Sequence, residues 1–275
     1  PANRGLRVFA PLFLFYNKLY HRKIHYVVIG GWLDSFLDEH KWLVRLLKKF
    51  DAIYVESDMM KSALQRRGFE NAVVMYNFKE LEPLAESDIE YPKSEPYKLC
   101  TFSRVMKEKG IEDAINAVES VNAHFGRTVY TLDIFGQVDV EYKERFSQLE
   151  KSFPDYISYG GAIEANKSIE TLKSYFALLF PTYYKGEGFA GTLIDAMSAG
   201  VPVIASDWKY NSEFVVPGKT GVIIENCNAE RLAEELINIA AAPEKWNSMR
   251  LSALKESEKY KPDIAARPLI DRING

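Results

Sequence analysis

The sequence predicts an α/β protein of two domains, each built on a parallel sheet covered by helices. Short runs that are apolar throughout alternate with longer amphipathic segments along most of the 275 residues. Strands of this kind are typical of parallel sheets buried on both faces. A stretch rich in acids and prolines, residues 80–96, interrupts the alternation. We expect it to link the two domains.

The individual elements follow from this alternation. Strands are predicted at residues 26–30, 52–55, 72–76, 98–103, 130–135, 156–159, 177–180, 201–205 and 221–224. Helices are predicted at residues 34–49, 57–67, 111–123, 141–151, 167–175, 191–198, 229–241, 244–258 and 263–273.

The first domain, residues 1–79, is predicted to hold only three strands. A doubly wound half commonly has about five or six. We therefore expect this domain to be incomplete at its amino end, with the second domain at residues 97–260.

The most informative segment lies at residues 186–207. Glu187 stands in a glycine-rich loop, and Asp195 follows in the first turns of the predicted helix 191–198. Gly200 ends this helix and Pro202 prevents its continuation. The loop offers free backbone N–H groups to a phosphate, and the two carboxylates can accept hydrogen bonds from sugar hydroxyls. Spacing alone also fits two solvated acids, but the strand, loop, capped helix and second strand occur together.

Other loops follow strands at the same predicted sheet edge, where open α/β sheets bind ligands. Arg104 and Lys109 come after strand 98–103, and suit a diphosphate as a fork and a point charge. Gly136, Gly161 and Ile163 follow the next two strands, and the glycines let a ligand approach the backbone. Surface charges and simple turns remain the alternative reading.

Together these residues resemble the nucleotide-sugar site of family 4 (group 1) retaining glycosyltransferases, which have the GT-B fold of two Rossmann-like domains. The family's Glu-x7-Glu signature appears as Glu187 and Asp195, and its Arg-x4-Lys-Gly motif begins at Arg104. The resemblance covers about residues 26–260.

This resemblance implies a role for each site residue. Glu187 would hold sugar hydroxyls, with Arg104 and Lys109 on the donor diphosphate as the other catalytic residues. The implied donor-binding residues are Gly136, Gly161, Ile163, Gly188, Phe189, Ala190, Gly191, Thr192 and Asp195. Asp195, one methylene shorter than the family's Glu, would hold the ribose. The C-terminal helix within 261–275 would return to the first domain.

On the acceptor side the sequence departs from the family. Many relatives carry a His where Gly30, Gly31 and Trp32 stand, so these three residues are the acceptor-side candidates. His25 begins its strand and is expected to be structural. Tyr183, Tyr184 and Lys185 either stack on a sugar or wall the cleft. The Tyr-Lys-Gly-Glu-Gly-Phe and Gly-Gly-Trp variants resemble bacterial enzymes of capsule, exopolysaccharide or lipopolysaccharide synthesis.

Composition restricts the partners. A net charge of −3 gives no indication of a nucleic-acid partner. The two cysteines and four histidines show no metal-ligand spacing, and the cysteines fit plain buried thiols in a reducing cytoplasm. No run is long enough to span a bilayer. The apolar run 8–16, followed by basic residues, is expected to be a buried helix or, alternatively, a contact with the inner membrane face.

We therefore expect a metal-independent, retaining glycosyltransferase without a cofactor. Its donor would be a nucleotide-diphosphate sugar, most simply a UDP-sugar, and its acceptor a saccharide or lipid-linked saccharide. Two alternatives stay open. One is a sugar phosphorylase or epimerase on a similar fold, and the other is a nucleotide-sugar-binding module that truncation has left inactive.

Overall fold

The computed structural model describes residues 3–80, 82–225 and 227–275. They form two compact units. The first unit takes in residues up to Lys79 together with Lys185–Ala190 and Tyr260–Gly275, and the second takes in Glu80–Tyr184 and Gly191–Lys259. Each contains one parallel sheet, of three and six strands respectively, which confirms the predicted α/β class.

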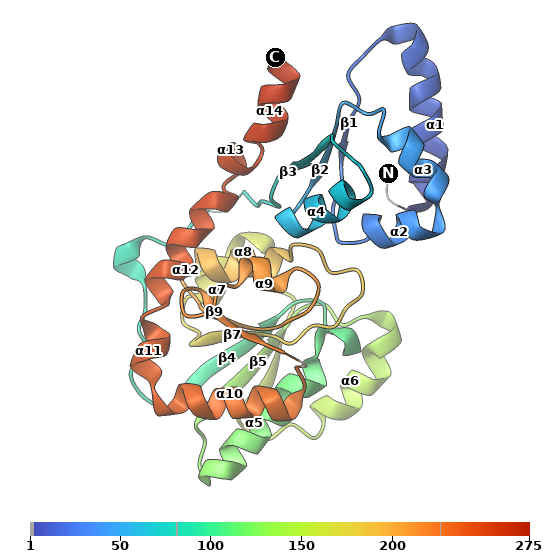
Figure 1. The fold of residues 1–275 in the computed structure, drawn as a ribbon. Coiled ribbons are helices and arrows are strands. Elements are labelled where there is room, and N and C mark those ends of the chain that lie inside the picture. Colours follow the sequence, from blue (N-terminus) through green and yellow to red (C-terminus); the bar gives the residue numbers. More distant parts are fainter. Residues whose placement is uncertain (1–2, 81, 226) are drawn as a thin grey trace. The chain divides into compact units, whose positions relative to one another are not determined.

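The first unit is built on strands in the order β1-β2-β3, with all neighbours parallel. The strand bounds are His25–Val27, Ala52–Val55 and Ala72–Val74. Four helices precede or join them (Figure 1): α1 (Asn3–Tyr20), α2 (Leu33–Glu39), α3 (Lys41–Leu47) and α4 (Asp58–Arg66). All four residues of β2 are buried, as expected of a central strand.

Two helices predicted as continuous in this unit are interrupted. Residues 34–49 form α2 and α3 because His40 leaves the helical conformation, at φ −126° and ψ 53°, with its ring stacked on Phe36. Residues 263–273 lie in α13 (Pro262–Ala265) and α14 (Arg267–Asn274). The second helix begins at Arg267, and Pro268 lies in its first turn, where proline has no N–H to continue the first helix.

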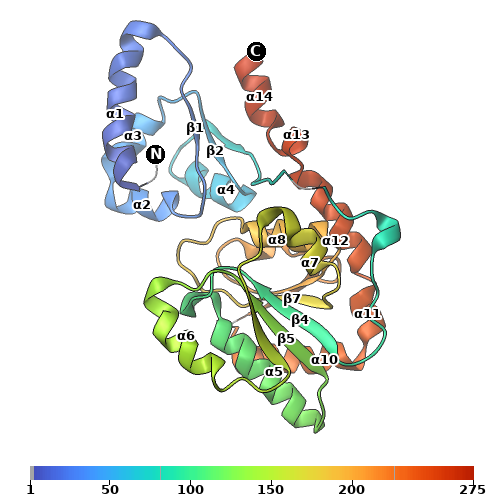
Figure 2. The ribbon, with the colours of Figure 1, turned by 180° about the vertical axis from the view of Figure 1, so that it is seen from behind.

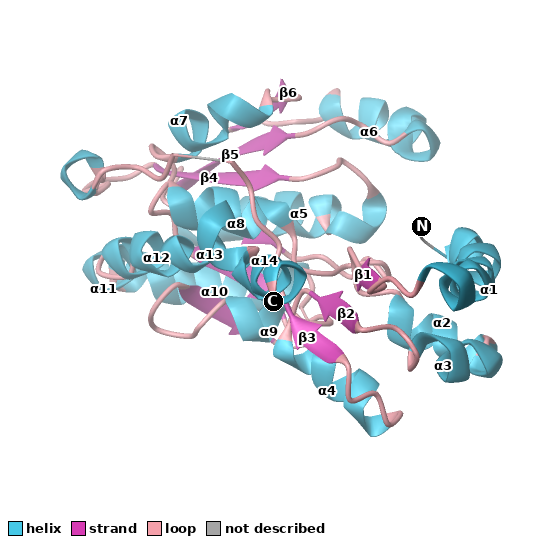
Figure 3. Ribbon diagram, turned by 90° about the horizontal axis from the view of Figure 1, so that it is seen from above, coloured by secondary structure: helices cyan, strands magenta, loops and turns pink. Residues whose placement is uncertain are grey.

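The second unit holds a doubly wound sheet in the order β6-β5-β4-β7-β8-β9. The bounds are β4 (Tyr97–Phe102), β5 (Tyr130–Phe135), β6 (Ile157–Gly161), β7 (Ala177–Phe180), β8 (Val203–Ser206) and β9 (Gly221–Ile224). Figure 3 shows β6, β5 and β4 side by side. The chain winds in opposite directions from β4, which creates a switch point between β4 and β7.

Helices cover both faces of this sheet (Figure 2). On one face α5 (Ile111–Phe125) packs on α10 (Ala229–Ala241). On the other face α8 (Gly191–Ser198) packs on α7 (Ser168–Leu172) and α12 (Arg250–Ser257). The remaining helices are α6 (Lys143–Glu150), α9 (Asn211–Phe214) and α11 (Pro243–Asn247). The predicted helix 244–258 is therefore divided into α11 and α12.

The stretch predicted as a linker packs with the second unit. Its described residues include a short 3-10 turn, η1 (Glu86–Asp88). The Leu84 N–H donates to the Ser198 carbonyl at 2.8 Å, and the Asn247 amide donates to the Pro92 carbonyl at 2.8 Å. Leu81, which lies inside the predicted linker, is outside the described residues.

Candidate functional site

In the second unit, Arg104 lies in the loop that follows β4. Its side chain is 61% exposed and forms an ion pair of 3.7 Å with Asp139. The loop itself is fixed, because the Val105 N–H donates to Gln137 O and Asp139 N–H donates to Val105 O, each at 2.9 Å. An exposed ion pair contributes only about 0–1 kcal/mol. The guanidinium can therefore exchange Asp139 for a phosphate at low cost.

Lys109 follows in the short 3-10 turn η2 (Lys107–Lys109). Its Nζ lies 5.4 Å from the ring centroid of Phe180 and 5.2 Å from that of Tyr184. Such cation–π contacts hold the ammonium beside the two rings. The Tyr184 ring thus contacts Lys109. The exposed Lys107 points to solvent in the same turn.

The turn that holds Lys109 is joined to the loop after β7. Gly110 has φ +71°, and a Cβ there would meet Pro181 O at 2.3 Å. The Tyr183 N–H donates to Glu108 O at 2.8 Å. Beyond this loop, the Trp208 indole donates to Tyr184 O at 2.7 Å. The ends of β4, β7 and β8 thus form one connected surface.

A cavity of about 290 Å³ opens beside the ends of β4, β5 and β6. Its lining residues are Phe102, Ser103, Phe135, Gly136, Gln137, Ala162 and Ile163. Gly136 and Ile163, both predicted as donor-binding residues, are among those that line this cavity. Gly136 has φ +137°, and a Cβ there would meet Ser103 O at 1.8 Å. Gly161 adjoins the cavity, since its carbonyl accepts the Gly136 N–H at 2.8 Å.

Helix α8 presents two polar residues predicted to bind the donor. Thr192, in its first turn, has a buried hydroxyl oxygen without a hydrogen-bond partner among the described residues. Asp195 is 1% exposed, and the Ser168 hydroxyl donates to its Oδ1 at 3.0 Å. Gly191 begins the helix as predicted. The unused Thr192 hydroxyl is suited to a ligand oxygen.

The loop of Glu187 packs with the first unit, although it was predicted within the 97–260 domain. Glu187 is 5% exposed. The Phe189 N–H donates to Glu56 Oε2 at 3.2 Å, and the Asn77 amide donates to Phe189 O at 3.0 Å. The Phe189 ring packs edge-on against Tyr260 with centroids 4.7 Å apart. These contacts fix the backbone at Phe189, between Gly188 and Ala190.

The acceptor-side candidates lie in the same unit, after β1. Gly30 has φ +85°, a value outside the range of a strand, and β1 ends at Val27, before the predicted residue 30. Its N–H donates to Glu56 Oε2 at 2.9 Å. Gly31 is buried, and the Trp32 indole donates to Ile29 O at 2.9 Å. His25 packs on Tyr54 with a 3.0 Å contact between Nδ1 and the hydroxyl, as a structural residue would.

Sequence reasoning missed Glu56. It is 4% exposed, and burial raises the pKa of its carboxyl while the amides of Gly30 and Phe189 act against that shift. The available signal was a carboxylate placed directly after a strand of wholly apolar residues. Ser168 was missed too, because its contact with Asp195 joins two helices distant in the sequence.

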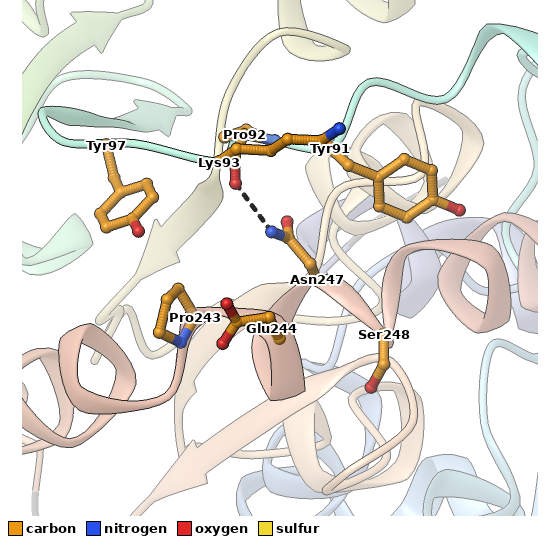
Figure 4. Close-up of a pocket in the computed structure, with 8 residues that line it drawn as sticks. All are labelled: Tyr91, Pro92, Lys93, Tyr97, Pro243, Glu244, Asn247 and Ser248. Atoms are coloured by element: carbon orange, nitrogen blue, oxygen red, sulfur yellow. Dashed lines mark hydrogen bonds between the residues drawn. The ribbon is translucent and has the colours of Figure 1, made fainter.

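A second cavity, of about 430 Å³, contains none of the predicted site residues (Figure 4). It is lined by Tyr91, Pro92, Lys93, Tyr97, Pro243, Glu244, Asn247 and Ser248. Among the described residues, no group of three or more His, Cys, Asp or Glu could hold a metal ion. No helix in the described ranges has both the length and the apolar character needed to cross a membrane.

Comparison with known proteins gives a family match. The family described as "Glycosyl transferases group 1" matches residues 85–256. The GtfA subunit of a UDP-N-acetylglucosamine–peptide N-acetylglucosaminyltransferase from Streptococcus gordonii is 30% identical, over 62% of this chain and 34% of that protein. The lipopolysaccharide core mannosyltransferase LpcC from Rhizobium leguminosarum is 24% identical, over 74% of this chain and 57% of that protein.

Among solved structures, Anabaena Alr3699/HepE in complex with UDP and glucose has a TM-score of 0.75 at 16% identity. The match covers 100% of this chain and 76% of that one, and it shows the GT-B fold. Against the two curated relatives, the chain spans about a third and somewhat over half of their length.

Proposed function

The chain belongs to the group 1 glycosyl transferases, and from this premise we propose that it transfers a sugar from a nucleotide-diphosphate donor with retention of anomeric configuration. One observation carries the proposal. The second unit presents Arg104, Lys109 and the Thr192 hydroxyl, which has no partner within the described ranges, on the loops and helix that follow β4 and β7. This is the edge at which doubly wound sheets bind nucleotides.

In this proposal the diphosphate is neutralised by Arg104 and Lys109, and by N–H groups at the start of α8. A sugar–phosphate bond breaks when negative charge on the departing diphosphate is stabilised. Preorganised cations and dipoles are often the largest contribution to such catalysis. Arg104 suits this role because its exposed ion pair with Asp139 is readily exchanged.

The remaining donor contacts are divided between the cavity and α8. The base would enter the cavity lined by Gly136 and Ile163, where the absence of a side chain on Gly136 permits close approach. Asp195, oriented by Ser168, would accept hydrogen bonds from ribose hydroxyls. Glu187 would hold the hydroxyls of the transferred sugar and orient its anomeric carbon.

A UDP-sugar is the proposed donor, and a saccharide or lipid-linked saccharide of bacterial polysaccharide synthesis the proposed acceptor. The name of the Streptococcus gordonii relative, a UDP-N-acetylglucosamine-dependent enzyme, supports uridine. The name of the Rhizobium relative supports a saccharide acceptor. We propose Gly30, Gly31 and Trp32 for the acceptor side, and a reaction that needs no metal, which chelation would test.

We also propose a cytoplasmic location with contact at the inner membrane face. Helix α1 carries exposed Phe9, Phe13, Phe15, Tyr16 and Tyr20. The exposed basic segment 21–23 follows it directly. Aromatic rings beside basic residues suit the interface of an anionic bilayer. Cosedimentation with anionic vesicles, and its loss when Phe13 and Tyr16 become Glu, would support this contact.

Calorimetry tests the donor site. UDP should bind, whereas Arg104→Ala combined with Lys109→Ala should abolish the measurable heat. A UDP-sugar panel with saccharide acceptors should then identify the reaction. If neither UDP nor GDP binds, the proposed function is overturned.

A further inference from the structure

Glu56 is a buried carboxylate that the roles proposed above do not use. It follows β2 directly and precedes Ser57, whose hydroxyl accepts the Met60 N–H at 3.0 Å and so caps α4. Only 4% of its surface is exposed. Burial of a carboxylate is unfavourable unless hydrogen bonds compensate it. The donors that face Glu56 therefore indicate what it does.

Both donors are backbone N–H groups, and they bond to the same oxygen. Gly30 donates to Glu56 Oε2 at 2.9 Å, and Phe189 donates to it at 3.2 Å. Gly30 opens the loop proposed for the acceptor side. Phe189 lies two residues after Glu187, in the loop proposed for the donor sugar. One oxygen atom thus connects two loops that are far apart in the sequence.

The contact between these loops leaves no room for a side chain. A Cβ on Gly188 would meet Glu56 Oε2 at 2.4 Å and the Gly30 Cα at 2.6 Å. Real Cβ atoms do not approach other heavy atoms so closely, so the backbone of one loop would have to shift. The missing side chain of Gly188 and the hydrogen bonds to Glu56 therefore both determine how far apart the two loops lie.

We propose that Glu56 is a positioning residue of the transfer site, which holds the Gly30–Trp32 loop and the Glu187–Ala190 loop at a fixed separation through its Oε2. This inference rests on the proposed function for the roles of the two loops. The backbone of Glu187 then has a fixed position relative to the acceptor-side loop. Small displacements of reacting groups lower turnover by about a hundredfold.

Amide hydrogen exchange at Gly30 and Phe189 tests the proposed connection, and it does not require an active enzyme. In Glu56→Ala, exchange should accelerate by about tenfold or more at Gly30 and at Phe189 together, since each loses its acceptor. Glu56→Gln should restore protection at both positions, because its amide oxygen can accept both bonds. Glu70→Ala, an exposed carboxylate of the same unit, is the matched control and should leave both amides unchanged.

Measurement of kcat tests whether the connection matters for sugar transfer. Glu56→Ala should lower kcat by about a hundredfold while the affinity for UDP stays within about twofold, because the proposed phosphate contacts belong to the second unit. Gly188→Ala should lower kcat in the same way, and it provides a second route if Glu56→Ala does not fold. Glu56→Gln should recover most of kcat.

The outcomes are distinguishable. Faster exchange at only one of the two amides, or unchanged kcat in both Glu56→Ala and Gly188→Ala, would overturn the positioning role. Exchange that accelerates evenly over the whole first unit would show a merely structural residue. Failure of the wild-type chain to bind UDP would instead overturn the proposed function, and the exchange result would still decide whether Glu56 connects the loops.

Discussion

The Ser168 hydroxyl donates a 3.0 Å hydrogen bond to Oδ1 of Asp195, and both residues are buried between α7 and α8. The bond restricts the rotamer of the carboxylate. Asp195 is therefore already oriented before any ligand arrives, which lowers the entropy lost on binding.

Asp195→Asn should weaken UDP binding by about ten- to a hundredfold, since a hydrogen bond to a charged group contributes about 1.5–3 kcal/mol. Asparagine keeps the volume and an acceptor for Ser168, so the fold should persist. Calorimetry would measure the change, with the exposed Asp207→Asn as control. Equal affinity in wild type and Asp195→Asn would remove Asp195 from the donor site.

Arg104→Ala and Lys109→Ala should each weaken UDP binding by about tenfold or more, because each removes a charge-assisted contact to phosphate. Lys107→Ala changes an exposed cation of the same turn and should have little effect. Binding of uridine, which lacks phosphate, should be the same in all three variants. A uniform loss for uridine and UDP would point to a disturbed fold instead.

Glu187→Gln should lower sugar transfer by about a hundredfold, as expected for removal of a preorganised polar contact at the reacting centre. Its affinity for UDP should hardly change, since UDP lacks the sugar that Glu187 is proposed to hold. Initial rates with a UDP-sugar, compared with those of Glu70→Gln, would measure this. Retention of more than about half the activity would contradict the role.

Gly136→Ala should lower both stability and UDP affinity. The added Cβ would meet Ser103 O at 1.8 Å, and φ is +137° at this position. Backbone strain of this kind commonly costs about 1–3 kcal/mol. Gly126→Asn is the control, since nothing lies within 4 Å of its Cβ position and asparagine tolerates its φ of +64°. Thermal unfolding would measure stability and calorimetry would measure UDP affinity, and both should fall in Gly136→Ala but not in Gly126→Asn.

Glu56→Gln should change how stability depends on pH. Burial raises the folded pKa of Glu56 above its ordinary value of 4.5. Over the window from that value up to the raised pKa, the folded state keeps a proton that the unfolded state has lost. Stability therefore falls as pH rises through this window, and glutamine, which does not titrate, removes this contribution.

Denaturant titrations of wild type and Glu56→Gln across this range would test the sign. The free energy of unfolding of the wild type, taken relative to Glu56→Gln, should decrease with rising pH. An increase would mean that the amides of Gly30 and Phe189 dominate and lower the pKa instead.

Local patterns predicted the elements of the second unit well. The helix predicted at 191–198 is α8, and the strand predicted at 177–180 is β7. A glycine at the end, a proline soon after and a wholly apolar strand act over a few neighbouring residues. Such signals can be read from the sequence because they need no distant partner.

Breaks within longer helices were harder to predict. His40 divides the predicted helix 34–49, although its neighbours continue the apolar periodicity. Its ring stacks on Phe36, a contact that a periodicity argument does not weigh. Pro268 did carry a signal, since proline removes an N–H inside the predicted helix 263–273.

The sequence by itself determined the α/β class and the candidate residues Arg104, Lys109, Glu187 and Asp195, because residue type and spacing after strands are local properties. Only the tertiary structure decided that residues 185–190 pack with the first unit, and that Glu56 bonds to both Gly30 and Phe189. The physical reason is that a buried carboxylate takes its donors from wherever the fold brings backbone N–H groups. Chain order does not encode those partners.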